Sequence, residues 1–163
     1  GSVRCVEETG IGLDMSKQSL GLFKISADTI YYPVFDLVYA AQTIKIGSES
    51  LKASLKRVVA GLKVVLKDKD DTVLSSSIDS VAVRITNIYS ELNYYTGEPQ
   101  GIPRTIAFPL ARSIDGTQMS NSTVMLFPSA GKSEFQLTIT LKNGNVKSFK
   151  QTLSSPLLSL IHI

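Results

Sequence analysis

LKASLKRVVAGLKVVL, residues 51–66, is the longest patterned run in the chain, and its pattern decides the fold. Its apolar residues occupy odd positions as far as Leu55 and even positions from Val58 onward. Side chains on a strand alternate between two faces, so this change of phase turns the apolar face around unless an extra residue is inserted. We therefore predict an extended strand with a β-bulge or bend near Arg57, which keeps one face on the core.

A helix is the competing interpretation of the same stretch, because apolar residues from Leu55 to Leu62 also recur at i, i+3, i+4 and i+7. Gly61 and four β-branched valines favour extended chain instead. Arg57, inside an apolar run, is expected to mark the bend and to find a carboxylate or carbonyl partner.

Several later runs also alternate. In the first, Val81, Val83 and Ile85 are expected to face inward, as in a half-buried antiparallel strand. A second run carries Pro109, which predicts a place near a sheet edge. Residues 112–122 are polar and are expected to form a mobile loop. The alternating runs span residues 79–88, 106–110, 124–128, 135–141 and 146–149.

The clearest local signal is Asn143-Gly144, which separates two alternating runs. Both residue types tolerate positive φ, so the pair predicts a hairpin with a type I′ turn. The chain ends in residues 157–163, which are apolar at nearly every position and predict a strand that needs cover on both faces.

Seven to nine short strands without a long helix predict an all-β protein, a single antiparallel β-sandwich. We assign residues 1–19 to an extended N-terminal arm or leader strand and residues 20–163 to the sandwich domain. No linker divides the chain, and its 163 residues suffice for one core.

Composition excludes several classes of protein. Apolar residues make up 43% of the chain, which argues against general disorder. The net charge is only +3, and Lys56-Arg57 is the only adjacent basic pair, so a nucleic-acid stripe is absent. No run of 18 apolar residues is long enough to span a membrane. Gly1-Ser2 is typical of an expression remnant, which is compatible with the earlier removal of an export signal.

The sequence predicts no catalytic, cofactor or metal site. A single cysteine, Cys5, cannot form an internal disulfide, and the single histidine, His162, has no positioned partner. Residues 131–133 (Gly-Lys-Ser) end like a phosphate-binding loop but lack the earlier glycine and precede a predicted strand, which favours an exposed turn. The acidic residues of 68–71 lack the rest of a calcium loop, which favours a solvated turn.

Tyr94 and Tyr95 lie in a loop rich in glycine and proline, and paired tyrosines offer a large amphipathic contact area. They are the candidate residues for contact with a sugar or a protein. A structural alternative stays open, in which one tyrosine packs beneath the loop.

From Asp36 to its end, the chain resembles the fimbrial anchor and accessory subunits of Bacteroidales-type pili. The residues that carry the resemblance are Leu55–Val64, followed in the family's order by Val81–Ile85, Leu92–Gly97 and Leu126–Ser129. The resemblance implies a transthyretin-like β-sandwich in an exported, lipoprotein-derived protein of the cell surface, outer membrane or periplasm. The family's second domain and lipid-bearing cysteine are not seen in this sequence, so a lipid anchor would lie upstream of the given chain.

The resemblance further implies a non-enzymatic subunit of fimbria assembly or adhesion, joined to its partners by β-strand addition. Those partners would be other fimbrial or surface subunits, with host protein or glycan as further candidates. Either the arm 1–19 or the apolar end could supply the added strand, and the candidate partner-strand residues are Leu158, Leu160, Ile161 and Ile163. A carbohydrate-binding module that uses Tyr94 and Tyr95 is the alternative function.

Overall fold

The computed structural model describes residues 11–14, 19–22, 30–41, 47 and 54–158. All regular elements within these residues are β-strands, which confirms the all-β prediction. They are β1 (Ile11–Asp14), β2 (Ser19–Leu22), β3 (Ile30–Tyr31), β4 (Val38–Tyr39), β5 (Lys56–Arg57), β6 (Ala60–Leu62), β7 (Val65–Lys67), β8 (Ile78–Ile88), β9 (Glu91–Asn93), β10 (Pro99–Gln100), β11 (Arg104–Arg112), β12 (Gln118–Ser120), β13 (Val124–Leu126), β14 (Glu134–Leu141) and β15 (Val146–Thr152).

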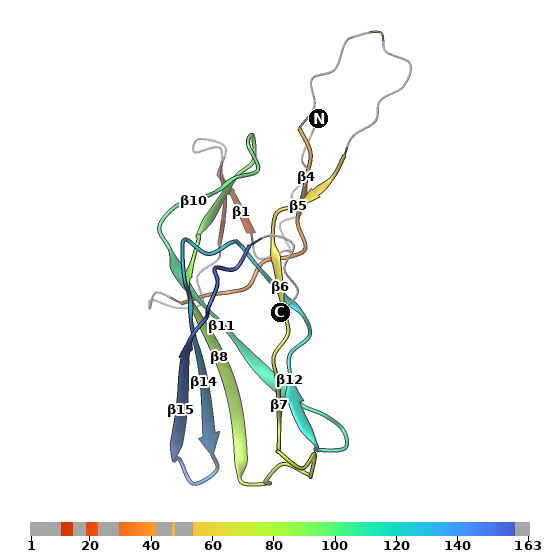
Figure 1. Ribbon diagram of the computed structural model, residues 1–163, viewed down its shortest axis with the longest axis vertical. Helices are drawn as coiled ribbons and strands as arrows, with labels where there is room; N and C mark the ends of the chain where they lie inside the picture. The colour runs from red at the N-terminus through yellow and green to blue at the C-terminus, as the bar shows by residue number, and fades with distance from the viewer. Residues whose placement is uncertain (1–10, 15–18, 23–29, 42–46, 48–53, 159–163) are drawn as a thin grey trace.

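The largest sheet has the order β15-β14-β8-β11-β12-β7, and β3 adds to β11 in parallel. Every other strand pair in the described residues is antiparallel. A four-stranded sheet, β1-β2-β9-β10, lies above the long strands in Figure 1, and the β4–β5 pair lies at the upper right. The described residues alone form fifteen strands, more than the seven to nine expected, because several predicted runs are broken into pieces of two or three residues.

The described part of the 51–66 stretch, residues 54–66, is extended and contains no helix. It is broken into β5, β6 and β7. The change of phase falls at Val58 and Val59, which are both buried, just after Arg57. The expectation that Leu55 faces inward is wrong, because its side chain is 67% exposed.

Arg57 has the carboxylate partner that was predicted. Its Nε and Nη2 donate to the two carboxylate oxygens of Asp36, each at 2.8 Å. The hydrogen bond and the charge of Asp36 raise the pKa of the Arg57 guanidinium. This bidentate pair links the segment that precedes β4 to the end of β5.

The central strands β8 and β11 supply the core as predicted. Val81, Val83 and Ile85 are buried, while Ala82 and Arg84 are exposed between them. β11 is not an edge strand, because it pairs with β8 on one side and with β3 and β12 on the other. Pro109 nevertheless lies where β11 pairs with β8 alone, so the stretch has one unpaired side that tolerates proline.

The hairpin β14–β15 forms where Asn143-Gly144 predicted it, but its turn is not type I′. Gly144 has φ of 84°, whereas Asn143 is not among the residues with positive φ. Gly144 N donates to Leu141 O at 2.8 Å, and Leu141 N donates to Asn145 O at 2.8 Å. This is a three-residue loop, a tight turn followed by a left-handed glycine, which also suits the strand twist.

Two smaller loop expectations are also corrected. Residues 112–122, expected to be a mobile loop, contain β12 and its buried Met119. Residues 131–133 are only partly an exposed turn, because Ser133 is fully buried. β14 follows them directly, so no helix offers its N-terminus to a phosphate there.

Candidate functional site

Burial falls steeply along one row of the largest sheet. Residues directly opposite one another in paired strands share a face, and Phe108, Val83, Leu137 and Phe149 are such partners across β11, β8, β14 and β15. The exposed fraction is 5% for Phe108 and 0% for Val83, but it reaches 56% for Phe149. The inner face of the sheet is therefore covered over β8 and β11 and uncovered at β15.

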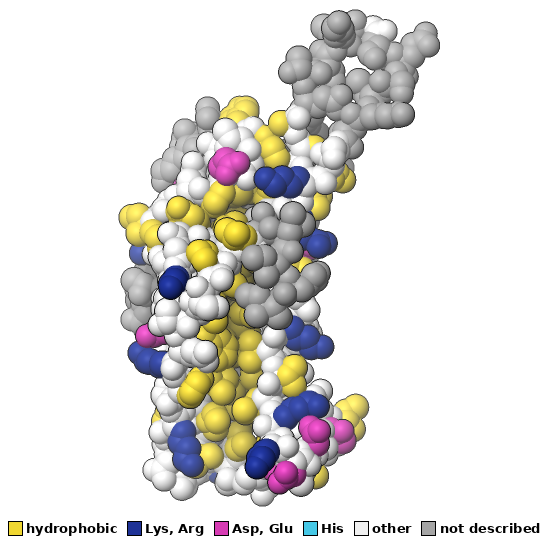
Figure 2. Space-filling model, in the orientation of Figure 1, with side chains coloured by type: hydrophobic (Ala, Val, Ile, Leu, Met, Phe, Trp, Pro, Cys, Tyr) yellow, Lys and Arg dark blue, Asp and Glu magenta, His cyan; other side chains and the backbone are white. Residues whose placement is uncertain are grey.

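The partly exposed end of this face is called the open strip and comprises Phe135, Leu137, Ile139 and Phe149. The three residues from β14 are half-buried, and every residue of β15 is exposed. Figure 2 shows a continuous column of hydrophobic side chains in the lower half of the molecule, between the β14–β15 side and the β7–β12 side of Figure 1. An apolar sheet face open to solvent is a surface suited to another chain.

The other end of the sheet order leads to a two-stranded arrangement called the edge ribbon, residues 60–67 paired with residues 118–126. β6 pairs with β13, and β7 pairs with β12, both antiparallel. Between the two pairs, three residues of one strand face two of the other, which is a bulge. No described residue pairs with the other side of β7, so its backbone forms a free edge.

Asn121 holds the bulge of the edge ribbon together. Its side chain is buried, with Oδ1 accepting a hydrogen bond from Val64 N at 2.7 Å and Nδ2 donating to Leu62 O at 3.0 Å. These bonds replace the backbone pairing that the bulge interrupts, as buried polar groups require. The free edge of β7 is thereby kept in line with β6.

The predicted partner-strand residues lie at the end of the chain, and only one of them can be located. Leu158 is 53% exposed, next to the buried Leu157. Leu157 is fixed to its own domain, because Ser129 N donates to Leu157 O at 2.9 Å and Leu157 N donates to Ser129 Oγ at 2.8 Å. Leu160, Ile161 and Ile163 lie outside the described residues, as do Cys5, His162 and the first ten residues of the predicted arm. Within that arm, residues 11–14 form β1 and pair with β2, which begins at Ser19, and residues 15–18 lie outside the described residues.

The two loop tyrosines have different environments. Tyr94 is half-buried and packs against the core, whereas Tyr95 is 60% exposed, and their ring centroids are 4.6 Å apart. Tyr39 of β4 donates from its hydroxyl to Tyr95 O, and its ring lies against Gly97. The loop is therefore held by Tyr39, and Tyr95 presents the accessible ring.

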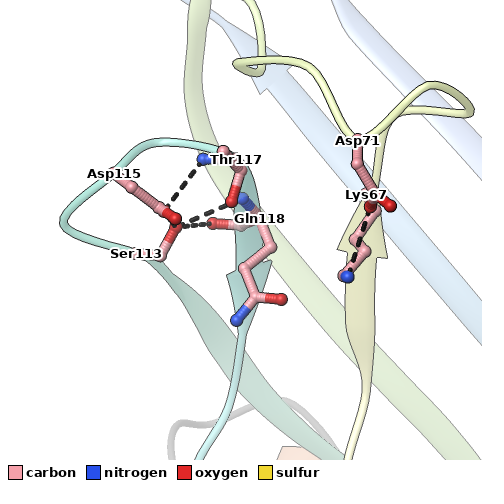
Figure 3. Close-up of polar contacts among 6 residues, drawn as sticks. All are labelled: Lys67, Asp71, Ser113, Asp115, Thr117 and Gln118. Atoms are coloured by element: carbon pink, nitrogen blue, oxygen red, sulfur yellow. Dashed lines mark hydrogen bonds and ion pairs between the residues drawn. The ribbon is translucent and has the colours of Figure 1, made fainter.

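Polar contacts at the lower end of the molecule stabilise turns. Figure 3 shows Asp115 and Ser113 in the β11–β12 turn, beside the ion pair between Lys67 Nζ and Asp71 Oδ1 at 3.2 Å. Ser113 Oγ donates to Asp115 Oδ1 at 2.5 Å, and this bond, with the Thr117 amide, lowers the pKa of Asp115.

The acidic residues of 68–71 form a solvated turn, as the sequence predicts. The hydrogen bond from Thr72 and the Lys69 amide lower the pKa of Asp68. Among the described residues, no group of three or more acidic, histidine or cysteine side chains could hold a metal. These contacts belong to turn structure, and they do not assemble a nucleophile with a base.

Sequence reasoning located the hairpin that carries the open strip but missed that its inner face stays uncovered. One signal was available in the sequence. Lys147 lies opposite Ile139, so its side chain leaves the strand on the inner face. A strand covered on that face would carry an apolar residue there. A lysine in this register indicates that no other part of the described chain packs over β15.

Comparison with known proteins identifies the family. The family model for fimbrillin-A associated anchor proteins Mfa1 and Mfa2 matches residues 7–159. The chain therefore belongs to this family. A search of curated proteins gave no match.

A solved structure supports the fold. The chain is similar to a crystal structure of a proposed adhesin from Bacteroides ovatus, with a TM-score of 0.61 and 13% sequence identity. The similarity covers 91% of this chain and 61% of the adhesin chain, so this chain spans less than two thirds of that protein. In the part of the chain that the structure describes, no helix is long and apolar enough to cross a membrane.

Proposed function

We propose that the protein is a non-enzymatic subunit of a surface fimbria that joins other fimbrial subunits by β-strand addition. An extended segment of a partner would lie over the open strip and pair with the free edge of β7. The observation that carries this proposal is the open strip itself, a partly exposed apolar face in a sheet whose two outermost strands, β15 and β7, each have one side without a partner among the described residues. Backbone pairing would supply affinity, and the apolar row would select the partner's side chains.

The family match supports the biological setting. A fimbrial anchor family implies an exported protein of the cell surface whose partners are fimbrial subunits. The N-terminal arm, residues 1–19, and the apolar end would serve as exchangeable segments in this role. Leu157 restricts the use of the apolar end as an exchangeable segment, because this buried residue holds the end of the chain against its own domain.

Two exposed residues of β15 test the proposal. Phe149 lies on the inner face, and Val146 lies on the outer face of the same strand with a similar exposed fraction. The purified chain is mixed with fimbrial subunits from its source, and complexes are separated by size-exclusion chromatography with light scattering. Phe149→Asp is expected to abolish the complex, and Val146→Asp to leave it unchanged. Equal complex formation by both variants would contradict the use of the open strip.

A second candidate function rests on the exposed ring of Tyr95. Aromatic rings that stack on sugars need one accessible face, and Tyr95 has it while Tyr94 is half-buried. A glycan array with Tyr94→Ala and Tyr95→Ala variants tests this function. Specific sugar binding that is lost in Tyr95→Ala would favour a carbohydrate-binding module, and absence of binding by the unmodified protein would exclude it for the glycans tested.

A further inference from the structure

The free edge of β7 has two chemically distinct sides. Along residues 62–67 the buried or half-buried side chains are Leu62, Val64 and Leu66, and the exposed ones are Lys63, Val65 and Lys67. A strand that pairs with this edge continues the same alternation, since opposite residues in a ladder share a face. Its inner side chains would therefore meet apolar surface, and its outer side chains would meet two lysines.

The charge on this edge is only partly compensated. Lys67 forms an ion pair with Asp71, but Lys63 has no ion pair within the part of the chain that is described. Lys147, across the open strip, also has none among the described residues. Figure 2 shows Lys and Arg side chains on both sides of the hydrophobic column, and acidic side chains near its lower end as well as elsewhere on this face. The β7–β8 turn, which follows Lys67, carries Asp68, Asp70 and Asp71.

We infer that the strand accepted at this edge alternates apolar and acidic residues, with the acidic side chains opposite Lys63 and Lys67. This inference rests on the proposed function, to which it adds the chemistry of the partner. Opposite charges on directly opposed strand residues stabilise pairing, and a lysine opposite a lysine opposes it. Lys63 is expected to contribute more than Lys67, because Asp71 already neutralises Lys67.

The chain's own apolar end does not fit this description. Residues 154–163 contain no aspartate or glutamate, so the same segment of a second copy would leave both lysines unpaired. The edge therefore disfavours the apolar end of a second copy as the added strand. Lysines on exposed edges also prevent unspecific pairing between sheets, and that role alone predicts no preference for acidic partners.

Synthetic nine-residue peptides separate these possibilities. Three peptides alternate valine with glutamate, serine or lysine, and a fourth has the composition of the glutamate peptide in blocks. Their binding to the full chain is measured by fluorescence anisotropy at low and at high salt. The glutamate peptide is expected to bind about 2- to 30-fold more tightly than the serine peptide, from two cross-strand charge pairs. The difference should shrink at 1 M salt, where surface charges are screened.

Charge reversal on the protein completes the test. Lys63→Glu with Lys67→Glu is expected to invert the order, so that the lysine peptide binds best, and Lys132→Glu, an exposed lysine outside the edge ribbon, should change nothing. Thermal unfolding checks that each variant folds. Equal binding of all three alternating peptides, with no binding of the block peptide, would overturn the charge preference and leave strand addition intact. Failure of every alternating peptide to bind would contradict strand addition at this edge, and with it the charge preference.

Discussion

The β8–β11 pair and the β14–β15 hairpin are built from the same kind of alternating sequence, yet they reach opposite degrees of burial. On the shared inner face, Phe108 is almost completely buried and Phe149 is more than half exposed. The sequence pattern of each strand is similar, so the difference comes from what lies over it. Alternation defines which side of a strand is apolar, and neighbouring elements decide whether that side becomes core or an interaction surface.

The largest effect expected from this comparison is on stability. Phe108→Ala removes a fully packed ring and should lower the free energy of unfolding by about 3–5 kcal/mol. Phe149→Ala removes a ring of the same kind from the exposed end of the row and should change the free energy of unfolding by less than about 1 kcal/mol. Urea denaturation of both variants measures the difference. Equal losses would show that β15 is covered in solution.

Two glycines extend the comparison to backbone positions. Gly97 has φ of 71°, and an added Cβ would lie 2.5 Å from the Tyr39 ring, so Gly97→Ala should cost about 3 kcal/mol from strain and overpacking together. Gly144 has φ of 84° but open space around it, so Gly144→Ala should cost only the backbone strain, about 1–2 kcal/mol. Thermal unfolding of the two variants ranks their losses of stability. A larger loss at Gly144 would contradict the packed arrangement of Tyr39 on the tyrosine loop.

The edge ribbon can be tested through Asn121. Asn121→Ala leaves Val64 N and Leu62 O without their partner, which should lower the free energy of unfolding by about 2 kcal/mol. Hydrogen exchange should accelerate at Val64 more than in β8. Unchanged exchange at Val64 would mean that Asn121 does not maintain the ribbon.

The smallest effect expected is a pH dependence from the β11–β12 turn. Hydrogen bonds lower the pKa of Asp115 below the value of the unfolded chain, about 3.9. The carboxylate therefore stabilises the folded state above that pH, and this contribution is lost as the pH falls through the folded pKa. Asp115→Asn should lose stability at neutral pH and show a flatter profile between pH 5 and 2. An unchanged profile would indicate that the carboxylate is not hydrogen-bonded in solution.

Much of the fold follows from the sequence by itself. Period-two runs predicted the strands around Val83 and Phe108, and Asn143-Gly144 predicted the hairpin, because these signals are local. The predicted type I′ turn was wrong. The observed three-residue loop places only Gly144 at positive φ, whereas a type I′ turn requires positive φ at both Asn143 and Gly144. The change of phase at Val58 and Val59 was predicted to within two residues, because it too depends on a local pattern of consecutive residues.

The candidate site was less predictable, because it depends on contacts between distant segments. The edge ribbon requires Asn121 beside Val64, a separation of 57 residues that no local pattern reveals. The open strip exists because no described segment packs over β15. The one sequence signal for this exposure was Lys147, a charged residue at a position that faces the inner side of the sheet. Tyr95 was proposed as a contact residue from the local sequence alone, but the sequence did not predict that Tyr39 of β4 holds its loop.

The most direct test of the account is hydrogen–deuterium exchange of the chain alone and in complex with its fimbrial partners. Strand addition predicts that those amides of residues 63–67 that point to the free edge exchange rapidly in the isolated protein and become protected in the complex. The Val64 amide, which donates to Asn121, and the amides of β8 should stay protected in both. Rapid exchange at residues 63–67 in a stable complex would contradict the account.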